Sequence, residues 1–115
     1  MDRLEMLVND LRRFVEERDW KQFHDPKNLA IAVACEAGEL LAEYRWVANA
    51  EADQLTRDTE RHARIAAEAA DVGIALLLFC DRIGLDLVDA VRSKMKTNSQ
   101  NYPVDKSKGK SERPQ

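Results

Sequence analysis

Two strongly apolar segments of this chain each carry a pair of carboxylates three residues apart. Glu36 and Glu39 stand among Ala, Val, Ile, Leu and Cys residues, and Glu68 and Asp71 lie in a second such segment, residues 65–80. A carboxylate that cannot reach water must be protonated, paired or bound to a cation, because an isolated buried charge is very costly. Few lysines or arginines interrupt either segment, so the pattern predicts that the four acids hold a divalent metal ion.

The spacing of the acids also predicts how the two segments pair. Residues three apart lie on one face of a helix, so each pair of carboxylates points in one direction. Residues 48–57, between the segments, are polar and turn-like, which favours an antiparallel helical hairpin. The midpoint of the four acids falls near residue 53, within that connection. Folding the hairpin there sets the two pairs level to within about one helical turn.

The hydrophobic pattern predicts an all-α chain of four helices and a tail. Apolar residues recur at three- and four-residue steps in the first helix, which is typical of one amphipathic face. The expected helices run from about residue 2 to Asp19, from Pro26 to about Val47, from near Thr56–Thr59 to Ile83, and from Asp86 to Pro103.

Short signals at the ends of these segments support the boundaries. Asp25 followed by Pro26 is typical of a helix N-cap with proline at the first helical position. Gly84 favours a helix end, and Asp86 resembles a cap for the last helix. Residues 1–103 are therefore predicted to form one helical domain. Residues 104–115 are polar and lack an apolar face, so we expect them to be a disordered tail.

The third predicted helix is apolar nearly all round between residues 65 and 80, so it needs cover on more than one side. Three other short helices leave part of that surface without cover. We therefore expect a four-helix bundle whose core is completed by oligomerisation, as a homodimer or homotetramer.

Composition narrows the class of protein further. The net charge of -3 over 115 residues offers no basic surface for a nucleic-acid polymer. The longest apolar run, residues 72–80, is too short to span a membrane. The N-terminus lacks the pattern of a signal peptide, and Cys35 and Cys80 stand alone in apolar segments, as expected of core thiols in a reducing compartment. A cytoplasmic location is expected.

The ligand types favour a hard cation. Di-iron bundles place histidine three residues after glutamate, and neither His24 nor His62 follows a glutamate at that spacing. An oxygen-only set suits Mg²⁺ or Mn²⁺, and proteins usually hold Mg²⁺ with carboxylates together with substrate phosphates. The remaining helical acids, such as Glu43 and Glu60, are expected to be solvated or paired with a cation.

At this point the residues resemble a known family. Glu36-x-x-Glu39 followed by Glu68-x-x-Asp71 is similar to the metal signature of the MazG-like, all-α nucleoside triphosphate pyrophosphohydrolases. Four further blocks resemble the dCTP pyrophosphatase branch of that family, and the similarity extends from about residue 14 to residue 104. The blocks are residues 20–29, 43–46, 94–98 and 101–104.

The resemblance implies hydrolysis of a (deoxy)nucleoside triphosphate, with a dCTP-like substrate preferred, to the monophosphate and pyrophosphate, as in cleansing of the nucleotide pool. It implies Mg²⁺ as the cofactor, with Mn²⁺ as a substitute, held by the four acids. Either Glu36 or Glu39 would accept the proton of the attacking water.

Three residues near the end of the folded part are candidates for substrate binding. Lys94 offers a cation to phosphate oxygens, and Asn98, one turn further on, offers a donor and an acceptor to a base edge. Tyr102 continues that strip. The alternatives are a solvated lysine, a fraying helix end and a tyrosine that packs beside Pro103.

The two tryptophans and one histidine are candidates for the base pocket. Trp20 and Trp46 would stack on a nucleobase, as the resemblance implies, although burial as core anchors is the commoner role of tryptophan. His24 either hydrogen-bonds the base or caps its connection.

Two other functions are compatible with the pattern. One is a related pyrophosphohydrolase that acts on another nucleotide, such as phosphoribosyl-ATP. The other is a non-catalytic helical interaction module that keeps a metal for structure alone. The two tryptophans and Asn98 favour recognition of the base of a simple nucleotide over phosphoribosyl-ATP. The four acids together with Lys94 argue against the module, because a structural metal site would not need residues that contact phosphate.

Overall fold

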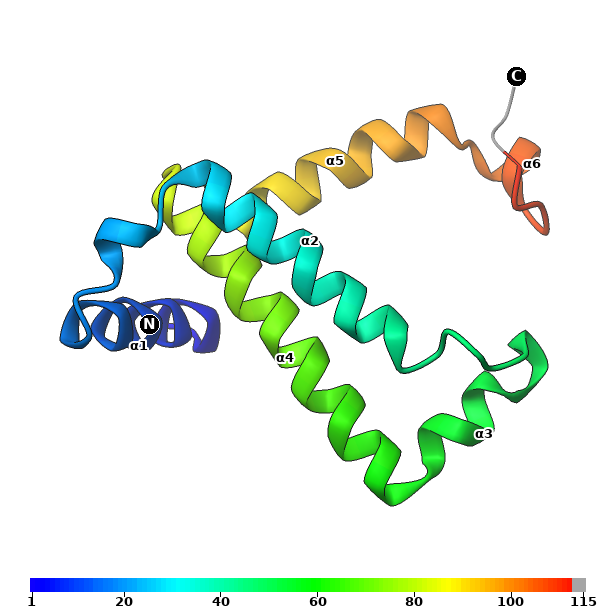
Figure 1. The fold of residues 1–115 in the computed structure, drawn as a ribbon. Coiled ribbons are helices and arrows are strands. Elements are labelled where there is room, and N and C mark those ends of the chain that lie inside the picture. Colours follow the sequence, from blue (N-terminus) through cyan, green and yellow to red (C-terminus); the bar gives the residue numbers. More distant parts are fainter. Residues whose placement is uncertain (113–115) are drawn as a thin grey trace. The chain divides into compact units, whose positions relative to one another are not determined.

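The computed structural model describes residues 1–112, and within that range it contains helices and no strand (Figure 1). The predicted all-α class is confirmed. The α-helices are α1 (Arg3–Glu17), α2 (Pro26–Ala42), α3 (Ala52–Arg57), α4 (Thr59–Arg82), α5 (Leu87–Asn101) and α6 (Val104–Ser107). The 3-10 helices are η1 (Lys21–Phe23) and η2 (Asn49–Glu51).

The chain divides into two compact units. The first, Met1–Gly84, contains α1 to α4, and the second begins at Leu85 and contains α5 and α6.

The predicted helix caps are present. The side chains of Asp25 and Asp86 each accept a hydrogen bond from a backbone N–H three residues on, at 2.9 and 3.0 Å. Pro26 occupies the first turn of α2, where its missing N–H costs nothing. Gly84 follows α4 with a φ of 68°, a left-handed conformation that glycine adopts without steric cost. These local signals therefore set the helix boundaries as expected.

The connection between α2 and α4 differs from the prediction. The second helix was expected to reach Val47 but ends at Ala42, and backbone bonds of the turn type follow, from Tyr44 N–H to the Leu41 carbonyl at 2.9 Å. Tyr44, Trp46 and Val47 favour helix only weakly, so contacts with α3 and α4 decide where the helix ends. The expected polar turn at residues 48–57 instead contains the two short helices η2 and α3.

The tail also contains more helix than expected. Residues 104–115 were predicted to be disordered, but Val104–Ser107 forms the single helical turn α6. Residues 113–115 of that prediction lie outside the described residues.

Few side chains of the single chain are fully buried. The buried apolar residues are Val15 on α1, Leu29 on α2, and Ala75 and Cys80 on α4. Cys80 is a core thiol as predicted, and burial raises its pKa. Cys35 was also expected in the core but is exposed in the single chain. Both thiols are free.

α2 and α4 lie side by side as the predicted hairpin (Figure 1). On the other side of α4, the guanidinium of Arg12 on α1 donates to Asp81 at 2.9 Å from Nε. Among the described residues, every helix is too short or too polar to cross a bilayer.

Candidate functional site

The hairpin brings three of the four predicted metal-binding acids together. Glu36 and Glu39 lie one turn apart on α2, and Glu68 lies on α4. One carboxylate oxygen from each of the three lies within 4.8 Å of the others. We call Glu36, Glu39 and Glu68 the acid cluster.

Asp71 lies outside this cluster of three but close to it. It sits one turn after Glu68 on α4, and its side chain is exposed. Its negative charge contributes to the raised pKa values of Glu36 and Glu68, so it acts on the same site. Its role as a fourth ligand stays a prediction.

Two oxygens of the acid cluster are buried without a partner. Oε2 of Glu36 and Oε2 of Glu68 are covered from solvent, and neither has a hydrogen-bond partner among the residues that the structure describes. A buried acceptor in this state carries a desolvation cost. The two atoms therefore lack a partner that a cation or a proton would supply.

The electrostatics of the cluster follow from this geometry. Loss of water raises the pKa of Glu36, and the charges of Glu39 and Asp71 raise it further. Loss of water also raises the pKa of Glu68, again with the charge of Glu39 as the next cause. Every cause that raises these pKa values would be opposed by a bound cation, because a positive charge favours the ionised carboxylates.

The donor set fits a hard divalent ion. The acid cluster offers only carboxylate oxygens, and no histidine or cysteine belongs to it. Oxygen-only sets suit Mg²⁺, Ca²⁺ or Mn²⁺ rather than zinc. Glu39 is exposed while Glu36 and Glu68 are half-buried, so the cluster opens to solvent on the side of Glu39.

Trp46 does not pack in a core within the single chain. Its side chain is 88% exposed and follows α2 in the connection toward α3. It lines a cavity of about 640 Å³ together with Val47, Leu55 and the charged side chain of Arg61. An exposed indole beside a cavity is available for stacking, whereas a core anchor is not.

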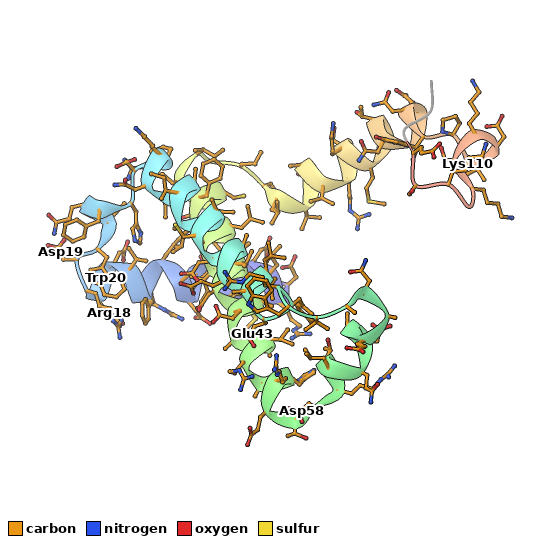
Figure 2. The ribbon with its side chains drawn as sticks, turned by 45° about the vertical axis from the view of Figure 1, so that its right-hand side comes forward. Arg18, Asp19, Trp20, Glu43, Asp58 and Lys110 are labelled. Carbon is orange, nitrogen blue, oxygen red and sulfur yellow. The ribbon has the colours of Figure 1, made fainter. Side chains whose placement is uncertain are left out.

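Trp20 and His24 flank η1 at the opposite end of the first unit. Trp20 precedes η1, is 44% exposed, and meets the ring of Phe14 edge-on with ring centroids 5.7 Å apart (Figure 2). His24 ends η1 and is half-buried. Neither is part of the acid cluster.

The remaining predicted substrate residues belong to the second unit. Lys94 and Asn98 lie on α5, and Tyr102 ends that helix, with its backbone N–H donating to the Asn98 carbonyl at 2.7 Å. All three are exposed and four residues apart, so they share one face. Their roles in substrate binding stay predictions.

Two arginine side chains on α4, which no sequence motif singles out, contact Glu43. Arg64 on α4 pairs with Glu43 at 3.3 Å, and Arg61 donates to the main-chain carbonyl of Glu43 at 3.5 Å. The expectation that Glu43 is solvated or paired is confirmed as an ion pair. The signal was present, because Glu43 and Arg64 share the sequence midpoint of Glu39 and Glu68.

The chain is similar in sequence to proteins that are named as pyrophosphatases. The chain is 41% identical over 109 residues to dCTP pyrophosphatase 1 of Rattus norvegicus, which covers 91% of this chain and 64% of that protein. It is 38% identical over 104 residues to dCTP pyrophosphatase 1 of Homo sapiens, which covers 87% of this chain and 61% of that protein. The chain thus spans less than two thirds of the length of these relatives.

A solved structure agrees with the fold. A pyrophosphatase from Archaeoglobus fulgidus superimposes with a TM-score of 0.84 at 35% sequence identity, covering 90% of this chain and 94% of that one. Residues 31–114, which include the whole acid cluster, match the MazG-like family. With this match and with relatives at about 40% identity, the chain belongs to the MazG-like family.

Proposed function

We propose that this protein hydrolyses (deoxy)nucleoside triphosphates, with a dCTP-like substrate preferred, to the monophosphate and pyrophosphate, in cleansing of the nucleotide pool. The observation that carries this proposal is the convergence of three glutamates from α2 and α4 around two buried, unpartnered carboxylate oxygens. Similarity to dCTP pyrophosphatases over most of the chain supports the choice of substrate.

Magnesium is the proposed cofactor, with Mn²⁺ as a substitute. Glu36, Glu39 and Glu68 would hold it, with Asp71 as a fourth ligand. When bound, the ion supplies charge neutralisation for the phosphate oxygens and the pyrophosphate leaving group. The carboxylates thus gain the positive charge that their surroundings lack.

The protein's own acid–base work falls to α2. Attack of water on the α phosphorus needs a group that takes up a proton, and we assign this to Glu36 or Glu39. Both carboxylates belong to the acid cluster, and Glu39 is the more exposed of the two. Glu36 and Glu39 are therefore both candidates for this proton acceptor.

Six side chains are proposed to bind the substrate. Trp46 would stack on the base, and stacking on one aromatic ring is worth about 1–3 kcal/mol. Trp20 lies at the other end of the first unit, so it would stack on the same base only from a second copy of the chain. His24 would hydrogen-bond the base. From the second unit, Lys94 would contact phosphate oxygens, and Asn98 with Tyr102 would contact the nucleoside. The exposure of Trp46 beside a cavity supports its part of this assignment.

We propose a homodimer or homotetramer in the cytoplasm. Large apolar side chains on both helices of the hairpin are exposed in the single chain, including Ile31 at 50%, Leu41 at 67% and Ile74 at 41%. Side chains of this kind are normally covered when they gather on a surface. Light scattering coupled to size-exclusion chromatography should give at least twice the chain mass at micromolar concentration, and a monomer would contradict this.

The test of the function is a panel of nucleotides scored for pyrophosphate release with Mg²⁺ present. Hydrolysis in ¹⁸O-labelled water should place the label on the nucleoside monophosphate, because attack is at the α phosphorus. Label found only in pyrophosphate would overturn the proposed point of attack. Turnover of phosphoribosyl-ATP alone would show that the protein acts on a different nucleotide. No thermal response to any triphosphate with Mg²⁺ would favour a non-catalytic interaction module.

A further inference from the structure

An ion pair joins α2 and α4 one helical turn beyond the acid cluster. Glu43 lies at the carboxyl end of α2 (Figure 2), and its Oε1 is 3.3 Å from Nε of Arg64. Glu43 follows Glu39 by four residues, and Arg64 precedes Glu68 by four, so each partner shares a helical face with a cluster carboxylate. The ion pair is therefore the next contact between the two helices of the hairpin, one turn closer to the connection than the acid cluster.

Two further hydrogen bonds strengthen this end of the hairpin. Nη1 of Arg61 donates to the main-chain carbonyl of Glu43 at 3.5 Å, where the last carbonyls of a helix lack intrahelical partners. The hydroxyl of Tyr44 lies 2.6 Å from Oγ1 of Thr56 and ties the connection to α3. Glu43 is thus held from α4 through both its side chain and its backbone.

The Glu43–Arg64 ion pair opposes the electrostatic repulsion within the acid cluster. Glu39 on α2 and Glu68 on α4 carry like charges across the hairpin, and like charges at short range repel. Arg64 directs its charge to Glu43, whose side chain is only 19% exposed, so the cluster keeps its own negative charge. The ion pair thus draws α2 and α4 together, one turn from the point where repulsion between Glu39 and Glu68 pushes them apart.

We propose that Glu43 and Arg64 are positioning residues, whose ion pair keeps α2 and α4 in the register at which Glu39 and Glu68 can bind one metal ion. This inference rests on the metal site of the proposed function. A half-exposed ion pair contributes little to global stability. If this pair had only that role, its removal would leave the metal affinity unchanged. A positioning pair changes metal affinity even where the protein stays folded.

The test is calorimetric titration of the full chain with Mn²⁺ alone, without nucleotide. Glu43→Gln and Arg64→Gln should each weaken Mn²⁺ binding by about tenfold, the lower end of the effect of residues that orient metal ligands. The double exchange Glu43→Arg with Arg64→Glu restores an opposite-charge pair, so affinity should return to within about threefold of the natural chain.

The Arg12–Asp81 ion pair gives a matched control on the same helix. It joins α4 to α1 instead of α2, so Asp81→Asn should leave the Mn²⁺ affinity unchanged. Should Glu43→Gln unfold, as judged by circular dichroism, Arg64→Gln carries the test alone, because Arg64 is 52% exposed.

The possible outcomes separate this inference from the proposed function. Natural affinity in both single variants, or a double exchange as weak as the single variants, overturns the positioning role and leaves the metal site standing. A natural chain that binds no Mn²⁺ overturns the metal site and the positioning role together.

Discussion

Replacing Glu68 with glutamine removes the one carboxylate that α4 contributes to the acid cluster while keeping the shape of the side chain. The cluster then consists of Glu36 and Glu39 alone, both on α2, so Asp71 is the one proposed ligand that would still link an ion to α4. The substitution also removes a carboxylate whose own pKa is raised by the charges of Glu39, Asp71 and Glu36, so it relieves repulsion at this site. We therefore expect opposite effects on stability with and without metal.

The expected size follows from linkage between binding and folding. At a free Mg²⁺ concentration about a hundredfold above its dissociation constant, an ion that binds only the folded chain stabilises it by about 2.7 kcal/mol. For a chain of 115 residues this raises Tm by roughly 8–14 °C. Losing a ligand that bridges the helices weakens binding by about a hundredfold, so the same Mg²⁺ concentration should raise the Tm of Glu68→Gln by only about 1–2 °C.

The assay is thermal unfolding followed by circular dichroism at pH 8, with EDTA and then with Mg²⁺. In EDTA the variant should melt above the natural chain, because repulsion within the cluster is reduced. Glu60→Gln is the control, since Glu60 is an exposed glutamate in the first turn of the same helix, and its Mg²⁺ response should be natural. A full Mg²⁺ response in Glu68→Gln would refute the assignment of the cluster as the metal site.

Three other measurements check separate parts of the account. The pKa values of Glu36 and Glu68 are raised in the folded chain, so their protonated forms stabilise it below the ordinary value of 4.5; in EDTA, Tm should fall as pH rises through the raised pKa values, and Mg²⁺ should reverse the trend. Trp46→Ala should raise KM more than it lowers kcat and should reduce fluorescence quenching by nucleotide, and unchanged kinetics would exclude stacking by this indole. Leu29→Ala should cost about 2–3 kcal/mol in denaturant unfolding because Leu29 is only 4% exposed, and Leu41→Ala, at 67% exposed, serves as the comparison; a larger loss for Leu41→Ala that depends on protein concentration would place Leu41 in a subunit interface.

Much of the hairpin could be predicted because its determinants are local. Asp25 and Asp86 cap their helices through backbone groups three residues away, and Gly84 ends α4 through its own backbone conformation. The facing of Glu39 and Glu68 follows from helical periodicity and a shared sequence midpoint. Signals of this range need no knowledge of the rest of the fold.

The connection was harder to predict for a physical reason. Helix propensity between residues 43 and 58 is mixed, because Ala, Glu, Arg and Gln alternate with Asn, Asp, Thr, Val and aromatic residues, so contacts made by the folded chain decide its path. Two hydrogen bonds join residues whose pairing no periodicity predicts. One links the hydroxyls of Tyr44 and Thr56, and the other runs from Arg61 to the Glu43 carbonyl. The end of α2 at Ala42 and the helical turn of α3 are consequences of that packing.

By itself, the sequence determined that four carboxylates lie level on two antiparallel helices, because helical geometry places a residue along and around its axis to within about one turn. Only the tertiary structure decided that Glu36, Glu39 and Glu68 converge within 4.8 Å while Asp71 stays outside, and that two of their oxygens lose both water and partners. These properties depend on side-chain rotamers and on the separation of the two helices. Both are set by packing between residues distant in sequence, which a one-dimensional pattern does not encode.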